Sequence, residues 1–243
     1  VANLKKEYAG TVYYDRYILG KWVNAEGIIY RKFANNPDKY VFDYQETEDG
    51  NNLPRGKTVI GIDYGGTQSG QAFVCTRISH DYKKVVVMTS KRIIERLDDE
   101  ALLKEQLKFI EDCMKKFKTD IDYIYPDNAE PTHIRSLRNA VNKLSWDITV
   151  RGSKKELILT RIDAQNKMLS FGVFYYIKDE CKTLEKALQE ALWDSKIKSS
   201  EGEDKRLDDF TTDIDTLDAY EYSFERDIKK IIDAIDMEEL DYD

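Results

Sequence analysis

From residue 57 onward, apolar and polar residues follow a pattern of alternating strands and helices. The short apolar run at 58–62 is typical of a buried strand, and two further runs at 71–78 and 84–90, joined by the turn-like residues 79–82, predict an antiparallel pair. Apolar residues then recur at helical spacing over 102–117, and the run at 121–125 predicts a strand that stops at Pro126. This βββαβ order predicts an α/β domain with a central mixed β-sheet flanked by helices.

The rest of the chain continues the same alternation without an internal repeat. The pattern predicts a helix from 131 to about 141, a strand at 146–150, a helix at 156–169, a strand at 172–177, a helix at 183–193 and a final helix at 213–232.

Composition divides the chain into four parts. Residues 1–34 are rich in Tyr, Ile and Trp and are too apolar for a tail, whereas residues 35–56 collect the Asn, Pro, Gly and acidic residues of a linker or long loop. We therefore expect a separate ordered segment at 1–34, a linker at 35–56, the main domain at 57–232 and an acidic tail at 233–243. The first residue is Val and not Met, which suggests a piece of a longer chain.

The overall composition is that of a protein with a sound core. Of 243 residues, 41% are hydrophobic and 35% are charged, which is outside the range of disordered chains. The three cysteines are far apart and odd in number, which excludes a disulfide framework or a CxxC metal site and fits a reducing compartment. No apolar run approaches the roughly 18 residues that span a bilayer, and the N-terminus lacks a signal-peptide core, so we expect a soluble intracellular protein without a membrane partner.

The net charge of −8 is unevenly distributed. Residues 199–219 carry eight acidic and two basic side chains, and residues 231–243 carry six acidic side chains and no basic one, whereas residues 1–198 have a net charge of +4. A mildly basic body with two acidic segments is compatible with a DNA-binding protein whose acids gather at a metal site or a tail, but it does not by itself indicate one.

Two predicted strands end in aspartates. Asp63 follows the first strand and precedes two glycines, and Asp127 follows the fourth strand. In a βββαβ unit the fourth strand lies parallel to and beside the first, so the two carboxylates project side by side, and two like charges that close favour a hard divalent cation. Each aspartate taken alone is as often a helix cap or a turn residue.

A third acidic group begins the final predicted helix. Asp215, Asp218 and Tyr222 are spaced to share one helical face, and the small Ala219 allows the helix to approach a sheet closely. Asp213 is expected to complement the helix dipole, which is also the ordinary explanation for such acids, whereas Asp218 lies in the second turn and better suits a site.

Four stretches resemble the nuclease domain of the large terminase subunit of tailed phages, a member of the ribonuclease H-like superfamily. The segment 17–30 is similar to the part that closes the terminase ATPase domain, and Gly61-Ile-Asp-Tyr-Gly65, Tyr125-Pro-Asp-Asn-Ala-Glu-Pro131 and Asp215-Thr-Leu-Asp-Ala-Tyr-Glu-Tyr222 resemble the three acidic motifs in order. The family's metal-binding aspartates match Asp63, Asp127 and Asp218. Many relatives have a His where this chain has Asp215, which leaves Asp215 open as a fourth ligand or an outer group.

The resemblance implies a metal-dependent endonuclease that cuts concatemeric double-stranded DNA by two-metal hydrolysis with Mg²⁺ or Mn²⁺. Asp63 would bridge both ions, with Asp127 on one and Asp218 on the other. It also implies an ATPase domain in the same full-length chain, a small terminase subunit and a portal protein as partners, and action in the host cytoplasm. Four lysines are candidates for phosphate contacts, although solvated lysines are the commoner explanation for each: Lys154, Lys155, Lys196 and Lys198.

Two other functions remain as alternatives. The sequence Asp63-Tyr-Gly-Gly-Thr67 resembles the phosphate loop of actin-like ATPases and sugar kinases, but those need a second lobe, for which the chain has no second copy of the motif. A catalytically inactive DNA-binding or motor-docking module is the other. A P-loop at 56–58 is excluded because no Gly has the required spacing and the segment precedes a strand. His80 and His133 are assigned no catalytic role.

Overall fold

A computed structural model describes residues 27–48, 50–65, 70–194, 206–209 and 211–240. Its centre is a six-stranded mixed sheet with the strand order β7-β6-β3-β4-β5-β8. The strands are β3 (Gly56–Asp63), β4 (Gln71–Ser79), β5 (Val85–Ile93), β6 (Tyr123–Pro126), β7 (Thr149–Val150) and β8 (Phe174–Tyr176).

The long strand β3 organises this sheet. It pairs antiparallel with β4, which pairs antiparallel with β5, and on its other side it pairs parallel with β6. The parallel pair needs a crossover, which α3 (Asp99–Phe117) supplies. The βββαβ order predicted from the apolar pattern is therefore confirmed, as is the mixed α/β class.

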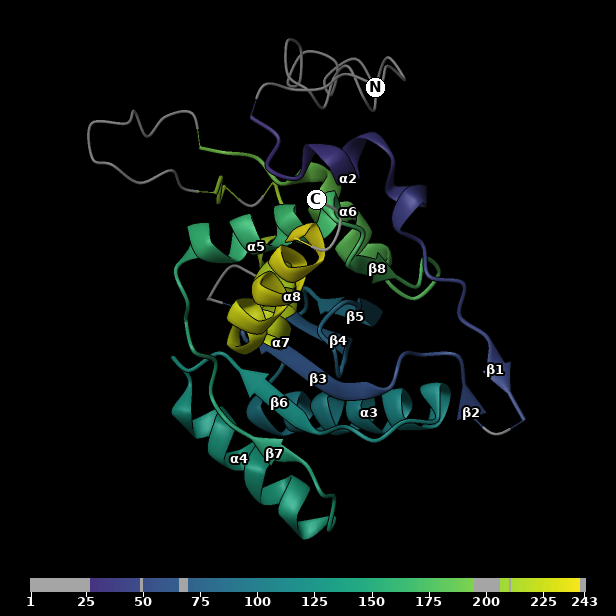
Figure 1. Cartoon of the computed structure of the whole chain (residues 1–243). Helices are drawn as coiled ribbons and strands as arrows, with labels where there is room; N and C mark the ends of the chain where they lie inside the picture. Colours follow the sequence, from purple (N-terminus) through teal and green to yellow (C-terminus); the bar gives the residue numbers. More distant parts are fainter. Residues whose placement is uncertain (1–26, 49, 66–69, 195–205, 210, 241–243) are drawn as a thin grey trace.

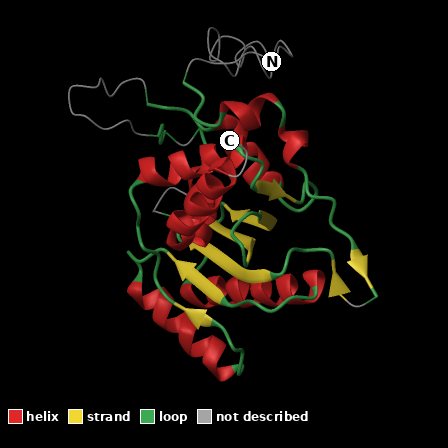
Figure 2. Cartoon of the chain, in the orientation of Figure 1, coloured by secondary structure: helices red, strands yellow, loops and turns green. Residues whose placement is uncertain are grey.

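Two layers of helices cover the sheet (Figures 1 and 2). One face carries α3 and α4 (Pro131–Lys143). The other carries α2 (Arg31–Asn35), α5 (Ile158–Ser170), α6 (Lys182–Glu190), α7 (Ile214–Phe224) and α8 (Ile228–Leu240). We call these the α3 face and the α7 face.

Alternation along β3 assigns its side chains to the two faces. Ile60 and Ile62 are buried against the α3 layer, whereas Val59 belongs to the core on the α7 side. Gly61 lies directly beneath α7, because a Cβ added there would stand 1.8 Å from the carbonyl oxygen of Ala219. Asp63, two residues further on, projects on the same side as Gly61.

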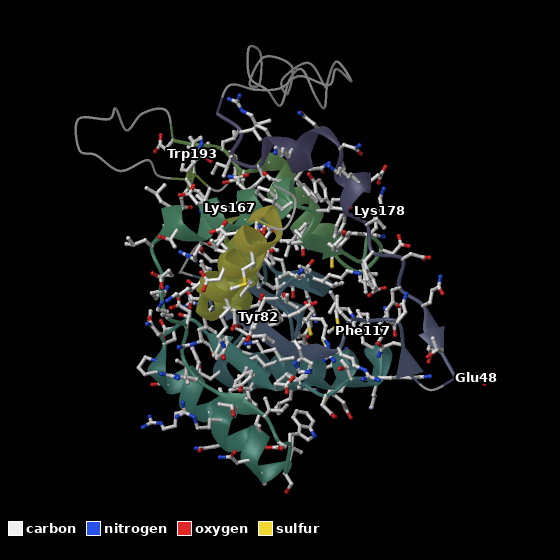
Figure 3. All side chains as sticks on the ribbon, in the orientation of Figure 1. Glu48, Tyr82, Phe117, Lys167, Lys178 and Trp193 are labelled. Carbon is white, nitrogen blue, oxygen red and sulfur yellow. The ribbon has the colours of Figure 1, made fainter. Side chains whose placement is uncertain are left out.

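The segment before β3 is attached to the same body. Tyr30 and Phe33 are fully buried in the core of the α7 face. The hairpin of β1 (Glu46–Thr47) and β2 (Gly50–Asn51) is fixed by the Asn51 side-chain amide, which donates to the carbonyl of Phe117 at 2.6 Å. Glu48 lies at the tip of this hairpin (Figure 3). The packing of residues 27–34 and 37–56, with the 3₁₀ turn η2 (Pro37–Tyr40), thus shows no separation from the domain at the expected linker.

The final helix differs from the prediction. A single helix at 213–232 is wrong: α7 ends at Phe224, a 3₁₀ turn η4 (Glu225–Asp227) follows, and α8 then continues to Leu240 through part of the expected tail. The break places two buried acids where they have partners. Glu225 accepts from the backbone amides of residues 154, 155 and 156, and Asp227 pairs with Lys57 at 2.6 Å.

Within the described residues, no helix is both long and apolar enough to cross a membrane.

Candidate acidic active site

Asp63 ends the central strand in a buried position. Its residue is 7% exposed, and one carboxylate oxygen accepts a hydrogen bond from the backbone amide of Gly65 at 3.2 Å. Gly65 has φ +62°, a backbone conformation that glycine adopts without strain, so the chain turns away sharply after the strand. The turn leaves the Asp63 carboxylate at the carboxyl end of β3.

Asp127 lies next to this strand end. Its backbone amide donates to the carbonyl of Ile62 at 2.8 Å, which continues the parallel pairing of β6 with β3 by one residue. Its carboxylate accepts from the amide of Ala129 at 2.9 Å and is partly exposed. Asp127 and Asp63 therefore stand at the same edge of the sheet.

The helix α7 brings a third acidic segment to this edge. It packs directly on β3 because Gly61 and Ala219 face each other without intervening side chains. A second contact fixes the helix on β4, where the hydroxyls of Thr76 and Ser223 lie 2.7 Å apart. The close approach expected of Ala219 is thus found, and glycine is required opposite it.

The acids of α7 have different partners. Asp213 caps the helix and accepts from the amide of Thr216 at 3.0 Å, as expected. Asp215 accepts from the guanidinium of Arg92 at 2.6 and 3.0 Å and from the amide of Gly70 at 2.9 Å. Asp218, one turn further on, takes none of these donors and belongs to a different cluster.

Electrostatics brings the four candidate carboxylates together. Burial raises the pKa of Asp63 well above its usual range, and the negative charges of Asp218, Asp215 and Asp127 raise it further. Burial also raises the pKa of Tyr222, and Asp218, Asp63 and Asp127 add to that shift. The aspartates predicted from the sequence therefore lie within electrostatic reach of one another around the end of β3.

Three basic side chains neutralise this acidic cluster. Lys155 Nζ lies 2.8 Å from a carboxylate oxygen of Asp127 and donates to the hydroxyl of Tyr222 at 2.8 Å. Arg161 and Arg206 each lie 3.1 Å from the same carboxylate oxygen of Asp218. The loop after β7, α5 and the segment before α7 supply these groups, and sequence reasoning named only Lys155, as one of several solvated lysines.

The two arginines also hold a deeply buried acid, Glu221. Its Oε2 lies 2.9 Å from Arg161 and 2.7 Å from Arg206, and the hydroxyl of Tyr30 donates to its Oε1 at 3.1 Å. Burial lowers the pKa of Arg206, but Glu221 and Asp218 outweigh it, so the net shift is upward and the arginine stays charged. Glu221 lies one turn beyond Asp218 on the same helix, a spacing that could have drawn attention to it.

The carboxylates do not stand in ligand geometry as they are paired. No group of three or more His, Cys, Asp or Glu side chains in the described part of the chain is arranged to hold a metal ion. The chemistry of the donor set still suits one, because clustered carboxylate oxygens are the ligands that hard divalent cations take. Binding requires Asp127 and Asp218 to exchange Lys155, Arg161 and Arg206 for the cation, while Asp215 would have to release Arg92.

An open pocket of about 560 Å³ borders the cluster. Its walls include Lys155, Arg161, Arg206, Asp218 and Tyr222. It gives solvent a path to the acids from the side of α5.

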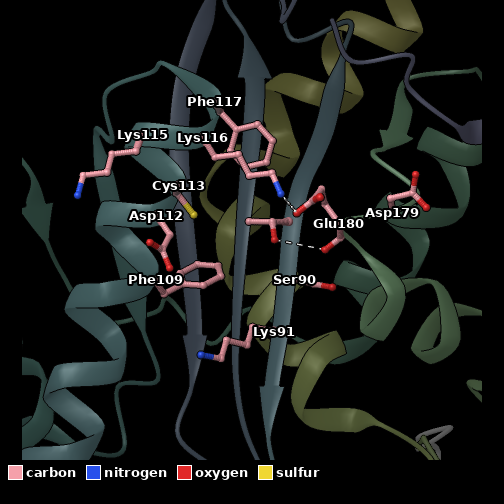
Figure 4. Close-up of a pocket in the computed structure, with 11 residues that line it drawn as sticks. Ser90, Lys91, Phe109, Asp112, Cys113, Lys115, Lys116, Phe117, Asp179 and Glu180 are labelled. Carbon is pink, nitrogen blue, oxygen red and sulfur yellow. Dashed lines mark hydrogen bonds and ion pairs between the residues drawn. The ribbon is translucent and has the colours of Figure 1, made fainter. Parts of the chain in front are cut away.

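A second pocket, of about 610 Å³, lies on the α3 face between α3 and β5 (Figure 4). Its lysines are already paired: Lys116 contacts Glu180 at 2.5 Å, Lys91 contacts Glu105 at 2.7 Å, and Lys115 contacts Glu111 at 2.7 Å. The sheet separates this pocket from the aspartates, so we do not assign it to the same site.

The other sequence candidates lie near the site or outside the described chain. His133 packs its ring against Tyr64, with centroids 5.0 Å apart, directly beside Asp63. Lys154 is exposed and pairs with Glu156. Lys196 and Lys198 lie outside the described residues, as do segment 17–26 and positions 66–67 of the alternative phosphate loop.

The sheet order and the acids at the end of β3 define a ribonuclease H-like α/β domain. Among solved structures, the chain is similar to the full-length large terminase of a thermophilic bacteriophage, with 24% identity, a TM-score of 0.59 and coverage of 92% of this chain and 51% of that one. It is also similar to the P22 large terminase nuclease domain (12% identity, TM-score 0.54, 81% of this chain and 93% of that one) and to the large terminase nuclease of thermophilic phage G20c (11%, 0.52, 83% and 99%).

These likenesses confirm, at the level of the fold, the resemblance to terminase nuclease domains indicated by the sequence motifs. The chain spans about half the length of the first of these terminases. No protein-family model and no curated protein matches it.

Proposed function

We propose that the chain is the endonuclease domain of a phage DNA-packaging terminase and that it hydrolyses phosphodiester bonds of double-stranded DNA with divalent metal ions. The observation that carries this proposal is the convergence of Asp63, Asp127 and Asp218 at the end of β3 within a terminase-nuclease fold. The convergence supports a metal site because so many carboxylates need a compensating cation.

In this proposal, Asp63, Asp127 and Asp218 hold Mg²⁺ or Mn²⁺, with Asp63 shared between two ions. Bound ions would activate a water for attack on phosphorus and stabilise the leaving 3′ oxygen. Burial keeps the Asp63 carboxylate poorly hydrated, and its single described hydrogen bond, from the Gly65 amide, leaves oxygen lone pairs free for a cation. Asp215 stays a candidate fourth ligand, and its present partner Arg92 favours a supporting position.

Lys155, Arg161 and Arg206 take a second role under this proposal. In the metal-free chain they balance the charge of Asp127, Asp218 and Glu221. When the aspartates turn to cations, these basic groups remain at the same place with charge to offer to a DNA phosphate. Glu221 stays paired with both arginines and keeps them fixed.

The wider assignments follow the same proposal. Concatemeric DNA is the substrate, the small terminase subunit and the portal are partners, an ATPase domain belongs to the same full-length chain, and the host cytoplasm is the place of action.

Substitution of Asp127 tests the proposal. Asp127→Ala should abolish manganese-dependent nicking of a supercoiled plasmid, while the metal-free melting temperature stays unchanged or rises because one of several clustered negative charges is gone. Lys155 keeps its hydrogen bond to Tyr222 in this variant, so the loop should not collapse.

The matched control is Asp147→Ala, which removes an equal charge from an exposed position just before β7. It should cut the plasmid at the wild-type rate. If Asp127→Ala retains activity, Asp127 is not a ligand, and if it fails to fold, Asp127 is structural. A wild-type chain that does not cut with either metal would contradict the nuclease assignment itself.

A further inference from the structure

Positive charge gathers on one stretch of this acidic protein. Residues 128–155 carry six basic and two acidic side chains, although the whole chain has a net charge of −8. The stretch comprises α4, β7 and the loop up to Lys155, and it begins directly after Asp127. The positive region therefore starts at the acidic cluster.

Packing holds this stretch rigidly against the cluster. The Asn128 amide donates to the hydroxyl of Ser153 at 3.2 Å, and the Asn128 side chain donates to the carbonyl of Ser153 at 3.3 Å. Gly152 packs against both Asn128 and Ile134, because an added Cβ would stand 3.1 Å from one and 3.4 Å from the other. The first turn of α4 also touches the site through the ring of His133.

The exposed side of α4 carries a basic stripe. Ile134, Leu137 and Val141 are buried, whereas Arg135 and Arg138 are exposed and lie three apart on one flank. Arg138 donates through Nε to the carbonyl of Val150 at 3.1 Å, which turns its guanidinium toward the strand beside it.

Most of this charge has no partner inside the protein. Within the described residues, no hydrogen bond or ion pair engages Arg135, Lys143 or Arg151, although all three are exposed. The guanidinium of Arg138 keeps further donors after its bond to Val150. Basic groups left free in this way suit a polyanion.

We propose that Arg135, Arg138 and Arg151 form a track for the phosphate backbone of duplex DNA leading away from the cleavage site. This proposal rests on the nuclease function proposed above and adds the surface that holds the substrate. At about 1.5 Å per residue, the 13 residues of α4 extend for about 20 Å, which matches about six base pairs of B-DNA. Contacts of this kind position a duplex without reading its sequence.

The test measures binding of a 30-base-pair duplex by fluorescence anisotropy in EDTA over a series of salt concentrations. Arg135→Ala/Arg138→Ala should weaken binding about tenfold at low salt and reduce the slope of log K against log salt by about 2, since each phosphate contact contributes about 0.9. Arg135→Glu serves as a second variant, because Arg135 has no described partner whose loss would disturb folding. It should weaken binding at least as strongly as the loss of one contact.

The matched control is Lys104→Ala/Lys108→Ala, which removes two exposed charges from one side of α3. It should leave affinity and salt slope close to wild type. Wild-type affinity and slope in both arginine variants, or an equal loss in the lysine control, would overturn the track while wild-type plasmid cleavage still supports the nuclease. A wild-type chain that neither binds nor cuts DNA would overturn both proposals.

Discussion

The two faces of the central sheet are built from different materials. On the α3 face, large apolar side chains of β3 and β4 meet the apolar side of α3, as Ile60, Ile62 and Phe73 pack with Phe109 and Ile110. The α7 face has small residues and buried polar groups near the strand ends, with Gly61 under Ala219 and the carboxylates of Asp63 and Glu221 below solvent reach. One face fills space, and the other brings charges together.

This difference teaches how the fold holds an unfavourable cluster of charge. Burial of large apolar side chains contributes stability on the α3 face. That stability offsets the cost of placing aspartates at the end of β3 in the metal-free protein, where burial penalises their charged forms. The α7 face therefore tolerates chemistry because the opposite face holds the sheet.

The largest expected effect comes from neighbouring positions of β3 that face opposite ways. Gly61→Ala adds one carbon into the backbone of α7 and should cost about 3 kcal/mol, at the upper end of overpacking. Ile60→Val removes one carbon from the α3 face and should cost about 1 kcal/mol. Urea unfolding measures both values.

The same pair separates stability from function. Gly61→Ala should also lose cleavage activity at temperatures where it stays folded, because displacing α7 moves Asp218 away from Asp63. Ile60→Val should keep wild-type activity. Equal costs for the two substitutions, or full activity in Gly61→Ala, would mean that the α7 contact is looser than described.

A smaller effect of opposite sign is expected at Asp63. Its pKa is raised in the folded protein, so between the unfolded pKa near 4 and the folded pKa the native state binds more protons, and stability falls as pH rises through that window. Asp63→Asn should therefore stabilise the metal-free chain at pH 7 by on the order of 1 kcal/mol. The gain should shrink as the pH approaches 4.

Thermal melts of Asp63→Asn and wild type from pH 4 to 8, with EDTA, check this expectation. A variant less stable than wild type at pH 7 would show that the Asp63 carboxylate has favourable partners that outweigh its burial. Addition of Mn²⁺ should reverse the order by stabilising only the wild type.

The parts of the molecule that local patterns encode were predicted well. The apolar runs ending in Asp63 and Asp127 fix two strands, and their parallel pairing follows from the crossover helix between them. The helical spacing around Asp218 indicates the third acidic segment. In each case the signal lies within a few neighbouring residues.

Features that depend on distant partners were not predictable in the same way. The break between α7 and α8 arises because Glu225 binds backbone amides of a loop about 70 residues earlier, and no local signal marks it. Arg161 and Arg206 reach Asp218 from separate segments, so their pairing has no sequence spacing to reveal it. The packing of residues 28–34 into the core likewise depends on contacts with α6 and α7.

The account depends on one metal site at the end of β3. Crystals of the chain soaked in Mn²⁺, with anomalous diffraction recorded near the manganese edge, test it most directly. We expect anomalous peaks within coordination distance, about 2.1 Å, of carboxylate oxygens of Asp63, Asp127 and Asp218, with Lys155 displaced from Asp127. Crystals that bind manganese elsewhere, or that keep the Lys155–Asp127 ion pair at saturating metal, would contradict the account.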